Sequence, residues 1–159
     1  MAVLSLSDHG AEQFFALARR LKEADDKDLR RELYKGLNSA MKPLIVGVRQ
    51  SAIDVLPRRG GLGAEIARSK MRTQRRTGAK SVGIKLIVTG TGGSMGRGRD
   101  IAALDRGKAR HPLFGNRSHW YLQAVPPGWF SRPTDNSKSS VQEQLLIAMQ
   151  NVADKIDRG

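Results

Sequence analysis

The feature that most constrains this chain is an apolar stripe at helical spacing in its first third. Over residues 29–56, apolar side chains recur every three or four positions, which is typical of one face of an α-helix. The stripe consists of Leu29, Leu33, Leu37, Ala40, Met41, Leu44, Val48, Ala52 and Leu56. It predicts a long helix that starts near Asp26 or Asp28 and is stopped by Pro57. Pro43 lies within the stripe, so we expect a kink there or two consecutive helices.

Two more helices are predicted, one before the long helix and one near the C-terminus. Ser7 or Asp8 can cap a first helix that runs to about Glu23. A final helix is expected to open at the capping box Ser140–Glu143. Its apolar face is formed by Val141, Leu145, Ala148, Met149, Val152 and Ile156.

Strands are predicted between these helices. Apolar and polar residues alternate over Ser81–Thr89, which makes this the clearest strand. Ile101–Leu104 and Trp120–Val125 are the other candidates, and together the three suggest a small antiparallel sheet. Since 159 residues without an internal repeat suit one core, we expect a single α+β domain over residues 1–159. Its N-terminal helices and C-terminal helix would pack on the sheet, leaving a long basic loop.

The position of this basic loop is predicted from the distribution of charge along the sequence. The formal net charge is +13, yet residues 58–110 carry fourteen Lys and Arg against three acidic residues, while the flanking segments are each close to neutral. Residues 58–79 also lack an apolar period, and we expect them to form a flexible basic arm with at most a helical turn around Ala64–Met71, and a second mobile turn at 90–98. The cations of this basic arm are Arg58, Arg59, Arg68, Lys70, Arg72, Arg75 and Arg76. Such a block indicates a polyanion or an acidic protein surface as partner, the alternative being a loop that only aids solubility.

Enzyme chemistry is not favoured by the side chains present. His111 and His119 could be combined with Asp105 and Ser118, but their spacing does not favour a catalytic arrangement over chance. The glycine-rich stretch Gly93–Gly98 lacks the lysine and hydroxyl that a phosphate loop requires. The chain has no cysteine and no apolar run long enough for a membrane span. We therefore predict a protein that is not an enzyme, binds no cofactor or metal and contacts no membrane.

The aromatic residues are concentrated in one segment, Arg110–Phe130, which we call the aromatic segment. It holds five of the eight aromatic residues: Phe114, Trp120, Tyr121, Trp129 and Phe130. Rigid rings of this kind dominate interface energetics, so the segment suggests an anchoring surface, although the rings could equally close a small core. Trp129 follows a Pro-Gly turn and is expected to be exposed, whereas Trp120 lies in an alternating run and is expected to point inward.

The same segment carries a family resemblance. A histidine-proline pair, then Gly115-Asn116, Trp120 and Pro127–Phe130 resemble the signature of neck and tail-completion proteins of long-tailed phages, found at the head–tail junction. The link at 58–79 is longer than the family's short one. The resemblance implies a ring of six copies in the virion, assembled in the host cytoplasm and stacked between the head connector or stopper and the tail tube or its terminator.

The function expected from this sequence is therefore structural. Phe114, Trp120, Trp129 and Phe130 would anchor contacts between subunits, and the basic arm would face a neighbouring ring or the DNA backbone. The alternative is a nucleic-acid-binding module unrelated to virions, because arginine-rich segments bind phosphates without reading sequence.

Overall fold

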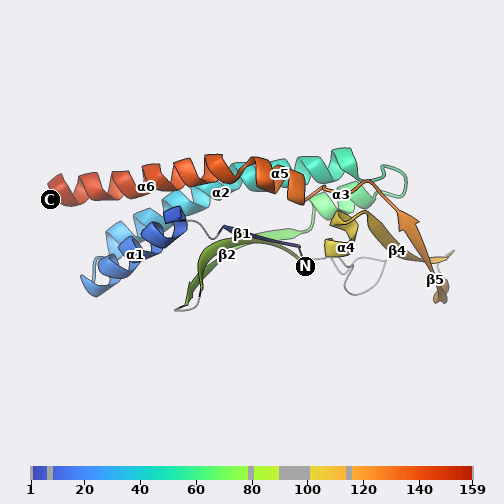
Figure 1. Ribbon diagram of the computed structural model, residues 1–159, viewed down its shortest axis with the longest axis horizontal. Coiled ribbons are helices and arrows are strands. Elements are labelled where there is room, and N and C mark those ends of the chain that lie inside the picture. Colours follow the sequence, from blue (N-terminus) through green and yellow to red (C-terminus); the bar gives the residue numbers. More distant parts are fainter. Residues whose placement is uncertain (1, 7–8, 79–80, 90–100, 114–115, 159) are drawn as a thin grey trace.

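The computed structural model describes residues 2–6, 9–78, 81–89, 101–113 and 116–158 (Figure 1). Its helices are α1 (His9–Glu23), α2 (Lys27–Val55), α3 (Leu62–Ala67), α4 (Ile101–Asp105), α5 (Ser131–Asn136) and α6 (Lys138–Arg158). Its strands are β1 (Ala2–Leu6), β2 (Lys70–Gly78), β3 (Ser81–Thr89), β4 (Lys108–Leu113) and β5 (Asn116–Ala124). The predicted α+β class is confirmed.

The apolar stripe forms the buried face of α2, as predicted. Asp26 caps this helix by accepting a hydrogen bond from the Leu29 backbone N–H at 2.9 Å, and the helix ends just before Pro57. All but one of the stripe's residues are buried, while Leu29 is half-buried. The alternative of two consecutive helices is wrong, because α2 continues through Pro43. Pro43 itself is exposed, so its ring does not enter the core.

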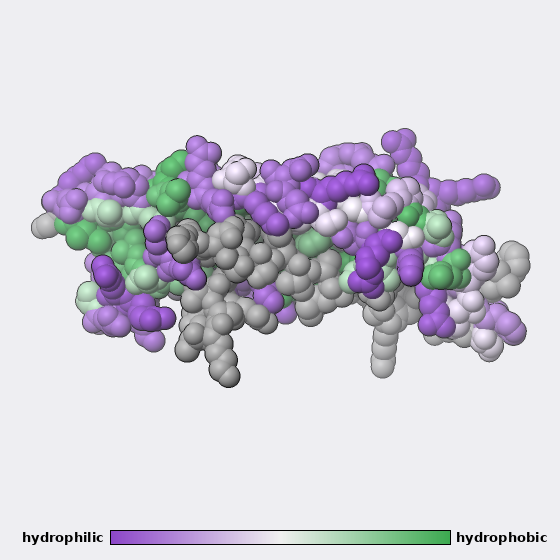
Figure 2. Space-filling model, in the orientation of Figure 1, coloured by the Kyte–Doolittle hydropathy of each residue, from purple (hydrophilic) through white to green (hydrophobic). Residues whose placement is uncertain are grey.

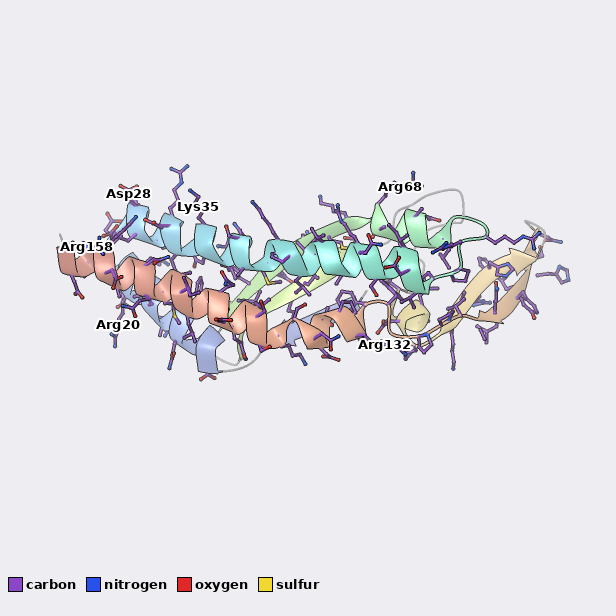
Figure 3. All side chains as sticks on the ribbon, turned by 90° about the horizontal axis from the view of Figure 1, so that it is seen from above. Arg20, Asp28, Lys35, Arg68, Arg132 and Arg158 are labelled. Atoms are coloured by element: carbon purple, nitrogen blue, oxygen red, sulfur yellow. The ribbon has the colours of Figure 1, made fainter. Side chains whose placement is uncertain are left out.

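Helix α6 runs antiparallel to α2 along most of its length (Figures 1 and 3). The two helices approach closely where Gly36 meets Ala148: a Cβ atom placed on Gly36 would lie 2.5 Å from that of Ala148. One turn closer to the N-terminus of α2, Glu32 binds Lys155 of α6 through its carboxylate. The predicted capping box is wrong. Helix α6 begins two residues before Ser140 and follows directly on α5.

Three strands form a sheet under the helices, in the order β1-β3-β2 and antiparallel throughout. Strand β3 confirms the predicted strand, and its residues Ile84, Leu86 and Val88 are fully buried. The strand β1, which the sequence analysis did not identify, pairs with β3 from Ala2↔Val88 to Leu6↔Ile84. Helices therefore cover one face of a small sheet, as expected from the α+β class.

The basic arm contains a short helix and a long strand over its described residues 58–78, so the expectation of an arm with at most a helical turn is wrong. Helix α3 packs on α2 through Gly63, whose missing side chain leaves room for the carbonyl oxygen of Ala52, 2.6 Å from where a Cβ would stand. Strand β2 then pairs with β3 over its whole length, from Lys70↔Thr89 to Gly78↔Ser81. Backbone hydrogen bonds to β3 hold β2 in the sheet. An edge strand can be held in this way without an apolar pattern in its side chains.

A second, two-stranded sheet is formed by β4 and β5 at one end of the molecule (Figure 1). Strand β5 confirms the strand predicted at Trp120–Val125. The strand predicted at Ile101–Leu104 is instead helix α4, in which Ile101 and Leu104 are buried one turn apart. The loop predicted at 90–98 lies outside the described residues.

Candidate functional site

The β4–β5 sheet, which we call the aromatic hairpin, carries three large apolar side chains in succession. The exposed fractions of Trp120, Tyr121 and Leu122 are 45%, 54% and 60%. The guanidinium of Arg110 lies 5.1 Å from the Trp120 ring centre. On the opposite face the ring of His111 lies 5.7 Å from that of Tyr121. The Trp120 and Tyr121 rings are therefore in contact with neighbouring side chains of the hairpin and remain accessible to a partner.

Trp129 and Phe130 belong to the core, so the prediction that Trp129 is exposed is wrong. Their exposed fractions are 0% and 4%, and the two rings stack edge to face at 5.7 Å. Gly128, at φ +87°, turns the chain inward here, and its N–H donates to the Asp105 carbonyl at 2.8 Å. The assignment of inward and outward tryptophans is thus reversed. The fourth predicted anchor, Phe114, lies outside the described residues.

Asp105 holds this turn in place through hydrogen bonds. Its carboxylate accepts hydrogen bonds from the backbone N–H groups of Phe130 at 2.8 Å and Ser131 at 3.1 Å, at the start of α5. The other catalytic candidates lie on the hairpin, where Asn116 accepts from the Ser118 N–H at 2.9 Å and its amide nitrogen lies 3.4 Å from Nδ1 of His119. These contacts serve local structure. Among the described residues, no cluster of three or more acidic and histidine side chains could hold a metal ion.

The cations predicted to act together in the basic arm are spread along the molecule. Arg58, Arg59, Arg68 and Lys70 are exposed around α3, and Figure 3 shows Arg68 far along the molecule from Lys35. On β2, Arg72 pairs with Ile87 and Arg75 with Ile84, so the two arginines face opposite sides of the sheet. Arg76 follows on the same strand. The structure therefore does not bring these residues into one cluster.

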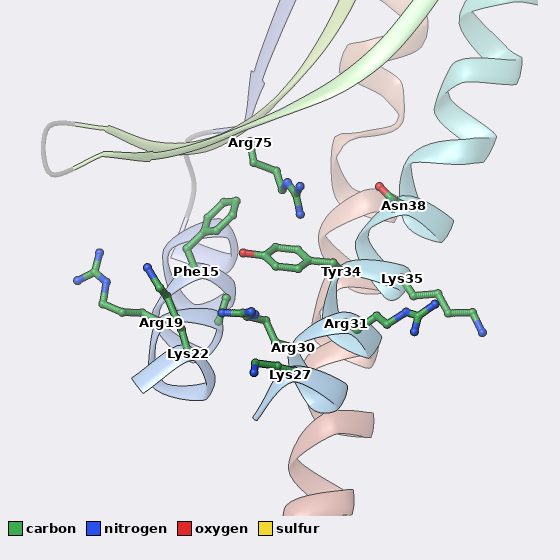
Figure 4. A pocket seen from close by; sticks show the side chains of 11 residues that line it. Phe15, Arg19, Lys22, Lys27, Arg30, Arg31, Tyr34, Lys35, Asn38 and Arg75 are labelled. Carbon is green, nitrogen blue, oxygen red and sulfur yellow. The ribbon is translucent and has the colours of Figure 1, made fainter. Parts of the chain in front are cut away.

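A different set of cations does converge, in a cleft of about 940 Å³ between α1, α2 and β2 that we call the basic cleft (Figure 4). Seven basic side chains line it, and no acidic one does. The basic residues are Arg19 and Lys22 of α1, Lys27, Arg30, Arg31 and Lys35 of α2, and Arg75 of β2. The remaining lining comes from Phe15, Ala18, Tyr34 and Asn38.

The middle of the basic cleft is occupied by Tyr34. The guanidinium of Arg75 reaches down from β2 and lies 4.2 Å from the centre of the Tyr34 ring, a cation–π contact (Figure 4). Lys27 and Arg30 extend from α2 toward α1, whereas Lys35 lies on the other side of α2. Arg75 is thus the one cation of the predicted arm that belongs to this site.

Within the described part of the chain, most of these cations are not neutralised. Lys27 lies 3.7 Å from Asp25, with both side chains largely exposed. The other six form no ion pair with a described carboxylate. Two of the nearby acids act elsewhere: Glu32 binds Lys155, and Asp26 caps α2. The cleft therefore has a concentrated positive charge.

Charge counting along the sequence missed this site, because residues 1–57 are almost neutral in total. Folding gathers six bases of that segment, and none of its acids, around the cleft. A signal was nevertheless present, since Lys27, Arg31 and Lys35 follow one another at four-residue intervals and so form a row along the helix.

A second cavity, of about 440 Å³, lies where the base of the aromatic hairpin meets the turn after α2. Its lining is mostly apolar and includes Pro57, Leu62, Leu104, Leu122 and Val125. The face of the molecule seen in Figure 2 is largely hydrophilic where it is coloured, with separate hydrophobic patches. None of the described helices has the length and apolar character needed to cross a membrane.

Comparisons with protein-family models, with curated proteins and with solved structures found no match for this chain.

Proposed function

We propose that this chain is a structural subunit of the neck or tail of a long-tailed phage virion, where copies of it close into a ring around the DNA passage. The observation that carries the proposal is the aromatic hairpin, which exposes Trp120 and Leu122 on one face of β5 and Tyr121 on the other. These residues belong to the same segment whose sequence resembles neck and tail-completion proteins.

The hairpin has the properties of a surface that a neighbouring copy covers. A two-stranded hairpin is marginally stable alone, and large apolar side chains on it gain most when a partner removes them from water. Aromatic side chains are also enriched among the residues that dominate binding energy. In a closed ring, the hairpin of one subunit contacts a different surface of the next, and this contact repeats until the ring closes.

The remaining partners follow from the resemblance. A ring of six copies would stack between the head connector or stopper and the tail tube or its terminator, after assembly in the host cytoplasm. In this role the protein acts by binding alone and needs neither a cofactor nor a catalytic site.

The proposal is tested by the assembly state of the full chain. Sedimentation velocity at increasing concentration should reveal a closed oligomer of one size, and antibody against the chain should label the neck of phage particles from the producing strain. Leu122→Asp should shift the oligomer toward monomer, because it places a charge in the interface. Gln123→Asp, on the next residue of β5, is the matched control and should assemble normally. The proposal would be refuted if the wild-type chain stays monomeric and the antibody labels no phage particle.

The basic cleft supports a second candidate, a nucleic-acid-binding module outside any virion. This second function predicts a monomer whose affinity for DNA falls steeply as the salt concentration rises. It also predicts that the protein is absent from phage particles. The same sedimentation and labelling experiments separate the two functions.

A further inference from the structure

We propose that the basic cleft between α1, α2 and β2 binds the phosphate backbone of nucleic acid without reading its base sequence. This inference does not depend on ring assembly, because a single subunit contains the whole cleft. It assigns a role to cations that lie mainly outside the basic segment of the sequence.

The first argument is electrostatic. Six of the cleft's seven cations have no carboxylate partner in the described part of the chain. Like charges gathered around one cavity repel each other and raise the local concentration of anions. A bound anion relieves that repulsion and releases the counterions that otherwise screen it.

The second argument concerns hydrogen bonding, and it favours phosphate over an acidic peptide. Lysine and arginine side chains only donate hydrogen bonds, and phosphodiester oxygens only accept them. A peptide would also bring a backbone N–H donor at almost every residue, for which the side chains lining the cleft offer few acceptors beyond Asn38 and the Tyr34 hydroxyl. The apolar side chains Phe15 and Ala18 are buried in the floor and provide no exposed anchor for a peptide.

The third argument concerns length. Lys27, Arg31 and Lys35 stand on successive turns of α2, about 6 Å apart along its axis, in a row that passes from the side facing α1 at Lys27 to the other side of α2 at Lys35. Arg19 and Lys22 provide further positive charge from α1, across the cleft. A single small anion contacts only a few of these groups, whereas a polymer with regularly spaced charges can contact many.

Tyr34 and Arg75 complete the site from above. The cation–π contact at 4.2 Å holds the Arg75 guanidinium over the cleft, although Arg75 is exposed and stands on an edge strand. Tyr34 is therefore a positioning residue for one of the phosphate-binding cations.

The test measures binding of the full chain to a fluorescein-labelled single-stranded oligonucleotide and to the corresponding duplex, by anisotropy, between about 50 and 200 mM salt. The cleft variant is Arg19→Gln with Arg30→Gln. The matched control is Arg58→Gln with Arg68→Gln, two exposed arginines at the α3 end. Both variants remove the same charge, so an effect of net charge alone would be equal in the two.

We expect the cleft variant to lower the slope of log affinity against log salt by about 1.5, or roughly 0.7 to 0.9 for each lost phosphate contact. Affinity at about 50 mM salt should fall tenfold or more, while the control stays within about twofold of the wild type. Oligonucleotides of different sequence should bind equally. The two labelled ligands show whether single strands or duplexes are preferred.

Two results would overturn the proposal. One is equal loss of affinity in the cleft variant and the control, which would mean that the net charge alone attracts DNA. The other is displacement of the oligonucleotide by polyglutamate of the same charge at equal or lower concentration, which would identify an acidic protein segment as the partner. Thermal unfolding curves of both variants, compared with that of the wild type, show whether each variant is folded.

Discussion

The two tryptophans show how far a single residue's position depends on distant contacts. Trp129 is fully buried, and its indole N–H has no hydrogen-bond partner among the residues that the structure describes, whereas Trp120 is 45% exposed. We expect Trp129→Ala to lower the free energy of unfolding by about 3 to 5 kcal/mol, because it leaves a cavity in the core. Trp129→Phe should cost less, since it also removes the unpaired buried N–H group. Urea unfolding of the isolated chain measures both changes.

Trp120→Ala provides the control for that experiment. Its loss should change stability by at most about 1 kcal/mol, mainly through the lost contact with Arg110. Its effect should appear in assembly instead. Equal destabilisation by Trp120→Ala and Trp129→Ala would contradict the burial of the two rings.

The sequence could not place these residues, because a Pro-Gly turn predicts that the chain reverses but not the side to which it turns. The side is set by Asp105, which binds the backbone of Phe130 and Ser131 from 25 and 26 residues away. A contact of that sequence separation leaves no periodic pattern, so local residue types led to the wrong assignment of both tryptophans.

At the scale of elements, the close crossing of α2 and α6 gives a prediction based on two glycines of the same helix. A Cβ on Gly36 would overlap that of Ala148, whereas a Cβ on Gly47 would meet nothing within 4 Å. We expect Gly36→Ala to destabilise the fold by about 1 to 3 kcal/mol through overpacking. Gly47→Ala should instead stabilise it by about 0.5 to 1 kcal/mol, because alanine favours the helix. Denaturant midpoints of the two variants should therefore move in opposite directions.

The success of sequence-based prediction for each element follows its burial. The helices α1, α2 and α6 and the strand β3 were predicted, because each buries one face and so shows an apolar period. Strand β2 shows no such period, since it is an edge strand with exposed arginines and is held by backbone pairing with β3. The basic cleft was missed for a related reason: it combines side chains from three elements, and only the fold brings them together.

For the whole molecule, the arrangement along α2 separates the two candidate interaction sites. The basic cleft uses α2 from Lys27 to Asn38, whereas the cavity at the base of the aromatic hairpin includes Pro57, just beyond the other end of this helix. At 1.5 Å per residue, Asn38 and Pro57 lie about 30 Å apart along the axis. This is several times the Debye length of about 8 to 10 Å at physiological salt, so charges at one site are screened from the other.

The two sites should therefore be separable by mutation. We expect Leu122→Asp to impair oligomer formation while leaving the nucleic-acid affinity of each subunit, and its salt dependence, unchanged. Arg19→Gln with Arg30→Gln should weaken nucleic-acid binding and leave the oligomer intact, since changes this far apart act independently. Affinities must be compared at concentrations where the wild-type chain is also monomeric, because a ring presents several clefts and binds a polymer more tightly through multivalency alone. If the cleft variant fails to assemble although it is folded, the cleft is itself a contact between subunits, and its cations serve the ring rather than nucleic acid.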